Sequence, residues 1–456
     1  MTGNFKVPDM LVKNCNVLVT MNKDREELRN ADIHISNGYI KEIGFGLKRI
    51  DSLEIIDGSQ SIVTPGLINT HDHLFQSLTK AVPNVQNVSL FEWLNGLYPI
   101  WGKMNPEQIF TATQLGLSEL AMSGCTFSAD HMYLFRNGTK LDDTILAASE
   151  VGLRFYPTRG AMSIGVSKGG LPPDYLIEDE EAILSDMERV VNKFHQPHEG
   201  ALVNVGLAPC SPFSVSKNLM IETANLARKL GVRLHTHLAE SEDDLRFSME
   251  KYGFTPGEYI QDLEWVGSDV WHAHCVKLSD KEVEIFKKTS TGVAHCPCSN
   301  CRLSSGIAPI TKLLKAGVNV GLGVDGAASS DSAHLLNEAR QTMLLQRLTK
   351  EGSGFSARNA LEIATIGGAR VLGRKDVGSI EIGKRADIAI WDLNKIPFSG
   401  AWDPVASLIF TGPHYVEKLI VEGNLVIDEG NLLTLDLQKL MRQAKLAVEE
   451  LMNKIP

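Results

Sequence analysis

The pattern of apolar and polar residues changes twice along the chain. Residues 1–63 and residues 376–456 contain short segments in which apolar and polar side chains alternate, separated by turns such as Asn37-Gly38. Alternation of this period predicts half-buried β-strands. We therefore expect the two ends of the chain to pair into one small β-sandwich domain, with a helix at the C-terminus.

The segment between these ends, residues 64–375, alternates strand-like and helix-like patterns. Eight apolar runs are typical of buried strands: "TPGLINTHDH", "CTFSAD", "RFYPTRG", "VNVGLAPC", "RLHTHLAE", "VWHAHCV", "GVAHCPC" and "NVGLGVDG". Helical patterns lie between them, such as residues 106–124 and 216–231, and both of these end in glycine. This order predicts an α/β fold, a (β/α)8 barrel of the TIM type. In such barrels the functional groups stand at the carboxyl ends of the strands.

The composition narrows the class of partner. Of 456 residues, 45 are Lys or Arg and 55 are Asp or Glu, which gives a net charge of −10 without a long basic block. This balance argues against nucleic acid or an anionic membrane as a partner. The first residues lack a signal-peptide pattern, and no apolar run is long enough to span a bilayer. The chain has seven cysteines, an odd number. We therefore expect a cytoplasmic enzyme with reduced thiols.

Two histidines follow the first expected barrel strand, in the segment "INTHDHLF". His71 and His73 are one residue apart, so their side chains point to the same side of an extended chain. Two imidazoles at the barrel mouth form half of a site for a divalent metal. The spacing alone is a weak signal, because hydrogen-bonded histidines also fit it.

The fifth expected strand, "RLHTHLAE", carries two more histidines. His237 lies nearer the mouth and is the expected metal ligand, whereas His235 lies deeper and is expected to pack against it. Glu240 comes just past the strand, where it can lean over the site as a proton carrier. The alternative for Glu240 is a solvated loop carboxylate.

The sixth and eighth strands end in further groups of the same kind. His274, in "VWHAHCV", is expected either to bind metal or to hydrogen-bond the attacking water or substrate. Asp325, in "GVDG", is expected to bind the metal and to take a proton from bound water, although the same four letters also fit a simple turn. Because four strand ends would place these groups around one barrel mouth, the combination indicates a metal-dependent catalytic site.

Three cysteines cluster after the seventh strand, in "HCPCSNC". Cys296, Cys298 and Cys301 lack a clear fourth ligand apart from His295, and structural zinc pairs usually have two to four residues between cysteines. We therefore expect small buried residues at the end of the strand rather than a second zinc site. Neighbouring Ser299 or Asn300 is expected near the pocket.

The order of "HDH", "HLAE", "AHC" and "GVDG" resembles the amidohydrolase superfamily, in its branch of purine, pyrimidine and triazine deaminases. The segments "HDHLFQSLTKAVPNVQ", "TRGAMSIGVSKGGLPP" and "HCPCSNCRLSSGIAPI" are most similar to 8-oxoguanine deaminases. The resemblance implies one divalent metal, most often zinc, with iron and manganese as alternatives. The ligands that it implies are His71, His73, His237 and Asp325.

The same resemblance assigns Glu240 as the proton shuttle and His274 as a hydrogen-bonding group beside the nucleophile. Relatives with two metals carry a modified lysine at the end of the fourth strand, and "VNVGLAPCSP" has no lysine. A single metal is therefore expected. The resemblance also implies a homo-oligomer, most often a dimer.

Three side chains are expected to contact the substrate. Gln76 is expected to pair with an amide edge of a ring, or else only to begin a helix. Arg159, after "YPT", is expected to bind a carbonyl oxygen, or else to form a salt bridge at the barrel rim. Trp93 belongs to an aromatic loop with Phe91, Tyr98 and Trp101, which is expected to cover a flat ring or to pack between domains.

These expectations predict a hydrolytic deaminase that releases ammonia from a small heterocyclic substrate with a guanine-like edge. Candidate substrates are 8-oxoguanine, isocytosine, guanine and pterins. A second hypothesis is an s-triazine hydrolase that displaces chloride or an alkylamine on the same scaffold. A third is a non-catalytic scaffold protein, against which the complete set of ligand positions argues.

Overall fold

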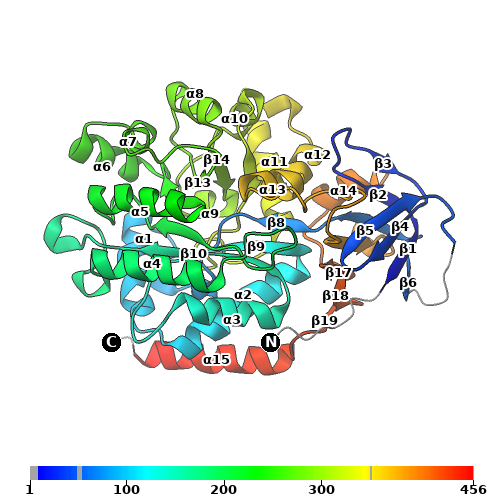
Figure 1. Ribbon diagram of the computed structural model, residues 1–456, viewed down its shortest axis with the longest axis horizontal. Helices are drawn as coiled ribbons and strands as arrows, with labels where there is room; N and C mark the ends of the chain where they lie inside the picture. Colours follow the sequence, from blue (N-terminus) through cyan, green and yellow to red (C-terminus); the bar gives the residue numbers. More distant parts are fainter. Residues whose placement is uncertain (1–8, 49–53, 350–351, 455–456) are drawn as a thin grey trace.

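The chain folds around a closed barrel of parallel strands, in the order β10-β11-β12-β13-β14-β15-β8-β9 (Figure 1). The computed structural model describes residues 9–48, 54–349 and 352–454. The barrel strands are β8 (Leu67–Asn69), β9 (Cys125–Met132), β10 (Arg154–Ala161), β11 (Gly206–Pro209), β12 (Leu234–Leu238), β13 (Val270–His274), β14 (Gly292–His295) and β15 (Val320–Leu322). All eight coincide with the runs expected from the sequence, although β9 and β10 extend two and one residues past theirs, and the α/β barrel is confirmed.

Helices surround the barrel. They are α1 (Leu90–Trp101), α2 (Pro106–Met122), α3 (Leu141–Val151), α4 (Glu180–Phe194), α5 (Lys217–Leu230), α6 (Glu242–Tyr252), α7 (Pro256–Asp262), α8 (Asp280–Thr289), α9 (Pro297–Arg302), α10 (Ile310–Ala316), α11 (Leu335–Leu348), α12 (Ala357–Glu362) and α13 (Gly368–Val371). Short 3-10 turns lie at η1 (Leu74–Leu78), η2 (Pro83–Val85), η3 (Val166–Lys168), η4 (Asp174–Leu176) and η5 (Gly352–Gly354), and a π-helical turn at η6 (Ile363–Gly367). The caps explain two boundaries. The Asn105 side chain accepts from the Gln108 amide at the start of α2, and Gly231 ends α5 with φ +69°.

Strands from both chain ends form two further sheets beside the barrel (Figure 1). One sheet has the order β19-β18-β17-β16-β7-β2-β3 and the other β5-β4-β1-β6. Their strands are β1 (Met10–Cys15), β2 (Val17–Val19), β3 (Glu27–Leu28), β4 (Ala31–Ser36), β5 (Tyr39–Gly44), β6 (Glu54–Asp57), β7 (Ser61–Pro65), β16 (Ile388–Asp392), β17 (Lys418–Val421), β18 (Asn424–Asp428) and β19 (Asn431–Leu432). Because only Gly66 separates β7 from β8, the sheet leads directly into the barrel.

The chain returns to the barrel after these sheets. The 3-10 turn η7 (Ile396–Phe398) and α14 (Pro404–Phe410) follow β16, and α15 (Leu437–Asn453) lies against α2, as Figure 1 shows at its lower edge. The buried residues of α15 are Leu440, Ala444, Ala447 and Leu451, one stripe of an amphipathic helix. The C-terminal helix therefore packs on the barrel and not on the sheets.

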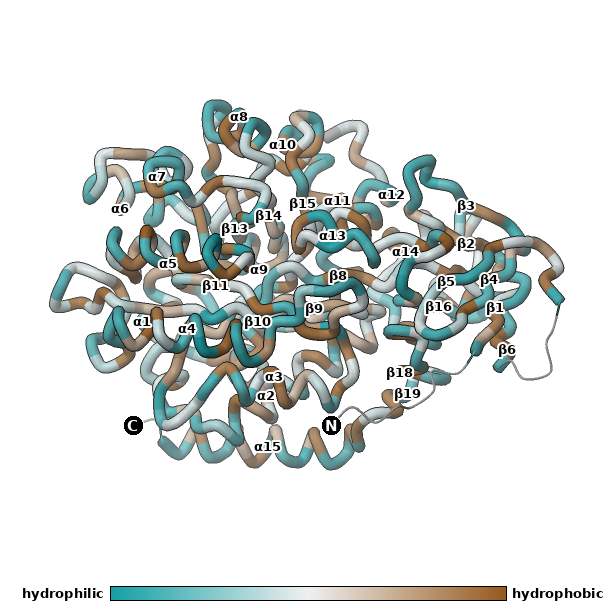
Figure 2. The backbone as a smooth tube through the Cα atoms, viewed as in Figure 1, coloured by the Kyte–Doolittle hydropathy of each residue, from teal (hydrophilic) through white to brown (hydrophobic). Residues whose placement is uncertain are grey.

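Apolar residues line the interior, and hydrophilic residues cover most outer turns (Figure 2). One large cluster of buried apolar side chains fills the barrel and its helices, and a smaller one, which includes Met10, Ile33 and Ile388, lies between the two sheets. Within the described part of the chain, no helix combines the length and the apolar character that crossing a bilayer requires.

Arg154 joins the barrel to the sheets. Its buried guanidinium donates from Nε to Asp387 Oδ2 at 2.6 Å and from Nη2 to Asp387 Oδ1 at 2.9 Å, and it also pairs with Glu422. The same group donates from Nη1 to the Gly200 carbonyl at 2.9 Å. Removing a guanidinium that is hydrogen-bonded on every side is costly, because its carboxylate partners then stay buried without a partner.

Replacing Arg154 with leucine is expected to lower the free energy of unfolding by about 3–5 kcal/mol, because a buried ion pair loses one member. Urea denaturation followed by circular dichroism measures this change. The matched control is Arg246→Leu, which removes an exposed pair with Asp243 and should cost less than about 1 kcal/mol. Equal effects of the two substitutions would contradict the role given to Arg154.

Candidate functional site

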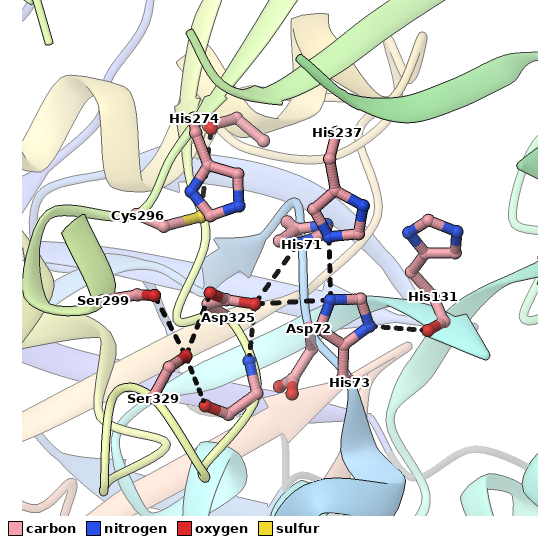
Figure 3. A network of polar contacts seen from close by, with 12 residues as sticks. His71, Asp72, His73, His131, His237, His274, Cys296, Ser299, Asp325 and Ser329 are labelled. Carbon is pink, nitrogen blue, oxygen red and sulfur yellow. Dashed lines mark hydrogen bonds and ion pairs between the residues drawn. The ribbon is translucent and has the colours of Figure 1, made fainter. Parts of the chain in front are cut away.

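The segment after β8 brings two histidines to the carboxyl end of the barrel. The Asp325 amide donates to the His71 carbonyl at 3.1 Å, and the His131 amide donates to the Asp72 carbonyl at 2.7 Å. Backbone bonds thus hold this segment between the end of β15 and the end of β9. His71 and His73 are buried side by side at the centre of the mouth (Figure 3).

Hydrogen bonds fix the tautomers of His73 and His237. His73 Nδ1 lies 2.7 Å from the His131 carbonyl oxygen, and His237 Nδ1 lies 2.6 Å from the Cys210 carbonyl oxygen. A carbonyl oxygen only accepts, so each Nδ1 carries the proton. Each Nε2 is therefore left with a free lone pair, as in a histidine that binds a metal.

His71 reaches the same state through a second histidine. His235 Nδ1 donates to the Trp271 carbonyl at 2.9 Å, so His235 Nε2 accepts from His71 Nδ1 at 2.8 Å. His71 Nε2 has no hydrogen-bond partner among the residues that the structure describes. His235 thus lies behind a ligand position, where the sequence places it.

The free nitrogens converge. His73 Nε2 lies 2.9 Å from His237 Nε2, and Asp325 Oδ1 lies 3.4 Å from the Nε2 atoms of His71 and His73 (Figure 3). Two lone pairs at 2.9 Å repel each other unless a cation lies between them. Separations of this size suit ligands about 2.0–2.2 Å from one ion, so the residues fit a divalent metal.

The pKa values of these groups agree with that fit. Burial lowers the pKa of the His237 imidazole to about 3 and also lowers the pKa of His71 and of His73. The three rings are therefore neutral at pH 7, as metal binding requires. The carboxylate of Asp325 supplies the negative charge.

His131 also belongs to this cluster, and the sequence reasoning missed it. It forms a potential ligand group with His71, His73 and His237, and its Nε2 donates to the Ala208 carbonyl at 2.8 Å. Its Nδ1 has no partner within the described ranges. The signal was present, because His131 is the next-to-last residue of its strand, as His237 is of its own.

Glu240 stands beside the potential ligands, and it faces His274, which forms a second potential ligand group with His71, His237 and Asp325. His274 Nε2 lies 3.5 Å from Glu240 Oε2, and Asn300 Oδ1 accepts from His274 Nδ1 at 3.0 Å. Burial raises the pKa of Glu240 to about 7, and the negative charge of Asp325 adds to that effect. Burial works to lower the pKa of His274, but the carboxylates of Glu240 and Asp325 outweigh it and raise the pKa. Glu240 can therefore exchange protons near neutral pH.

Two of these residues have strained backbones. His274 has φ +70° and Asp325 has φ +60°, in the left-handed region that side-chain-bearing residues seldom adopt. Such conformations cost on the order of 1–3 kcal/mol each and gather at functional sites. The Ser329 hydroxyl donates to Asp325 Oδ2 at 3.1 Å and the Gly326 amide to Oδ1 at 2.7 Å, which holds the carboxylate in place.

A cavity of about 380 Å³ opens beside the site. Its polar lining consists of His73, Gln76, Tyr133, Cys210, His237, Glu240, His274 and Asp325, and its apolar lining of Leu90, Trp93, Leu94, Phe213 and Leu303. Both Gln76 amide atoms are buried and lack a hydrogen-bond partner in the described part of the chain. Trp93 Nε1 donates to the Ala328 carbonyl at 3.2 Å, which fixes the indole in the cavity wall.

Arg159 lies elsewhere. Its Nη2 lies 2.8 Å from Glu178 Oε1 and its Nε 2.8 Å from Asp186 Oδ2, and its guanidinium stacks 3.7 Å from the centre of the Phe135 ring. It is not part of the cavity wall. Arg159 was expected either to bind a substrate carbonyl or to form a salt bridge at the barrel rim. The structure shows the salt bridge, because two carboxylates already accept from its N–H donors.

The cysteine cluster forms no potential metal group in the described residues. Cys296 is buried, but Cys298 is half-buried and Cys301 exposed, because the chain leaves β14 at His295 and enters α9. The expectation of three buried residues ending a strand was therefore wrong for two of them. Ser299 and Asn300 do reach the site: Ser299 hydrogen-bonds Ser329 at 3.0 Å, and Asn300 bonds His274.

Comparisons with known proteins agree with this arrangement. Residues 62–426 match the model of the Amidohydrolase family. The chain is 42% identical to an 8-oxoguanine deaminase from Pseudomonas aeruginosa, over 87% of this chain and 88% of that protein. It is 34% identical to an isoxanthopterin deaminase from an unknown prokaryotic organism, over 100% of both. The solved structure of atrazine chlorohydrolase TrzN from Arthrobacter aurescens TC1 complexed with zinc has a TM-score of 0.92 and 31% identity, covering 96% of this chain and 100% of that one.

Proposed function

Because this chain belongs to the amidohydrolase family, we propose that it is a metal-dependent deaminase of a heterocycle with a guanine-like edge. The first candidate is 8-oxoguanine, and isocytosine, guanine and pterins share the edge. The observation that carries the proposal is the buried, unpartnered carboxamide of Gln76 in the same cavity as Glu240. A carboxamide both donates and accepts hydrogen bonds, so it complements a ring edge that carries one donor and one acceptor.

The resident metal in this proposal is a single divalent ion, with zinc as the first candidate. His71, His73, His237 and Asp325 would hold it. When bound, such an ion lowers the pKa of a coordinated water toward about 7 and makes hydroxide available. Metal analysis of the purified enzyme tests this assignment, and a protein that never retains zinc, iron or manganese would favour a non-catalytic scaffold.

The chain's own side chains move the protons. Asp325 accepts a proton from the attacking water, and the bond from Ser329 keeps its carboxylate oriented for that step. Glu240, protonated at first, donates to the ring nitrogen beside the carbon under attack, so negative charge does not build up on the ring. His274, held by Asn300, hydrogen-bonds the oxygen that becomes the new carbonyl. Asp325 then passes the proton taken from water to the amine, which leaves as ammonia, while the proton of the added hydroxyl returns to Glu240 as the new carbonyl forms.

An s-triazine hydrolase is the second candidate, because the chlorohydrolase structure covers almost the whole chain. The two candidates release different products. An ammonia and chloride assay over 8-oxoguanine, isocytosine, guanine, pterin and chlorotriazine substrates separates them. Chloride release without ammonia would overturn the deaminase proposal.

The rate should depend on the protonation of Glu240. Its pKa of about 7 lies within the physiological range, and the proposed step needs the protonated acid. We therefore expect kcat/KM to fall as the pH rises above the pKa of Glu240, because the ionised carboxylate has no proton to donate. A pH profile of ammonia release measures this, and a rate that rises through the same range would contradict the role of an acid.

Gly326 is expected to position Gln76. A Cβ atom at residue 326 would lie 2.0 Å from Gln76 Oε1, so the Gly326→Ala substitution forces the carboxamide away from the cavity wall. Losing its hydrogen bonds to the substrate should raise the activation free energy reported by kcat/KM by about 1–3 kcal/mol, mainly through a higher KM. Steady-state kinetics measure the effect. Gly354→Ala, where a Cβ meets open space, is the control and should change nothing.

A further inference from the structure

A second cavity lies at the opposite end of the barrel, beside the amino ends of β10, β11 and β12. It encloses about 910 Å³ of empty space, part of it open to solvent. Its charged and titratable lining consists of Tyr156, His195, His198, Glu199, Arg233, Arg374, Lys375 and Asp376. Neither the proposed reaction nor the family comparison gives this cavity a role.

Arg233 is the centre of the cavity. Its Nη2 donates to the Val371 carbonyl at 2.7 Å, but its buried Nε has no partner among the described residues. It forms no ion pair within those residues, although Arg374 in the same lining is paired with Asp376. Burial also lowers the pKa of its guanidinium, which marks a charge without full compensation.

The backbone makes room for this guanidinium. Gly373 has φ +72°, and a Cβ there would lie 2.7 Å from Arg233 Nη1. A side chain at residue 373 would therefore displace the guanidinium or cover its remaining donor. The local chain thus holds a cationic fork in place and leaves part of it open toward the cavity.

Other donors surround the same space. His195 Nδ1 accepts from the Val205 amide at 3.1 Å, so the neutral ring carries its proton on Nε2. Lys375 is exposed and forms no ion pair in the part of the chain that is described. The Asp376 carboxylate is already engaged by Arg374 and by the Gly200 amide. Glu199 adds one exposed carboxylate without an ion pair in the described residues, but the free donors of Arg233, His195 and Lys375 outnumber it, which favours an anion with several oxygens.

We infer that this cavity binds a phosphoryl group, either as inorganic phosphate or on a small phosphate ester. Arg233 supplies a guanidinium charge with unused N–H donors in the cavity lining, and Lys375 supplies a mobile point charge at the rim. A carboxylate has only two oxygens and would leave more of these donors unused. The site is remote from the barrel mouth, so its ligand does not take part in the proposed reaction.

Calorimetric titration of the metal-loaded enzyme with inorganic phosphate, and separately with ribose 5-phosphate, tests the inference at constant ionic strength. We expect saturable binding of one ligand per chain, weakened at least about tenfold by Arg233→Met, since a charge-assisted bond contributes about 1.5–3 kcal/mol. Tight binding of the ester would identify an ester as the ligand, and binding of phosphate alone would identify the free ion.

Controls separate this cavity from the metal centre. Lys375→Glu changes an exposed residue and should also weaken binding, so the test survives if Arg233→Met does not fold. Arg246→Met, whose guanidinium pairs with Asp243 on the surface, should leave binding unchanged. Absence of saturable binding, or binding that neither Arg233→Met nor Lys375→Glu alters, would overturn the inference, because phosphate would then bind elsewhere or not at all.

Discussion

Replacing Glu240 with glutamine is expected to lower kcat for ammonia release by about 10²–10⁴-fold, the usual contribution of a general acid or base. Glutamine keeps the shape and polarity of the side chain but holds no transferable proton. The cavity wall is therefore preserved, and substrate affinity should change little. Because Glu240 belongs to neither potential metal-ligand group, the variant should retain as much metal as the parent enzyme.

The matched control is Glu242→Gln, two residues further on. Glu242 begins α6, is exposed and pairs with Lys277 at 2.7 Å, so its neutralisation should leave kcat unchanged. Steady-state kinetics and metal analysis of both variants complete the test. A Glu240→Gln enzyme with more than about a tenth of the parent kcat would exclude Glu240 as the proton carrier.

The sequence predicted most of the site because strand ends and catalytic groups coincide in this fold. His71, His73, His237 and Asp325 each follow or end an apolar run, and parallel closure of the barrel brings those ends together. Periodicity thus identified the barrel, and the polar residues at its strand ends identified the site. The family resemblance gave these residues individual roles.

Contacts between residues far apart in the chain could not be predicted from the sequence. Arg159 ends its strand like a site residue, but its partners Glu178 and Asp186 come from a loop and a helix whose placement no local pattern fixes. His131 was missed although it lies near the end of its strand, because its proximity to His237 depends on closure of the barrel, in which β10 and β11 separate their two strands. Local patterns predict which residues reach the mouth but not which neighbours they find there.

Asp325→Asn is expected to remove activity by at least about 10⁴-fold, because one substitution takes away both a charged ligand and the proton acceptor. The carboxamide is nearly the same size, but it has one oxygen where the carboxylate has two, so only one of the Gly326 amide and the Ser329 hydroxyl keeps an oxygen to donate to. The three neutral imidazoles would then face a divalent ion without the one negative charge among the proposed ligands. We therefore expect weaker metal retention, measured by elemental analysis after dialysis.

Adding excess zinc to Asp325→Asn separates the two roles. High metal concentration should restore occupancy, since His71, His73 and His237 remain, but it should not restore turnover, because asparagine accepts no proton from water. The control is Asp331→Asn, which alters a carboxylate six residues later that pairs with Arg302 at 3.2 Å and should leave both properties intact. Turnover that returns fully with zinc would show that Asp325 acts only as a ligand and that another group takes the proton.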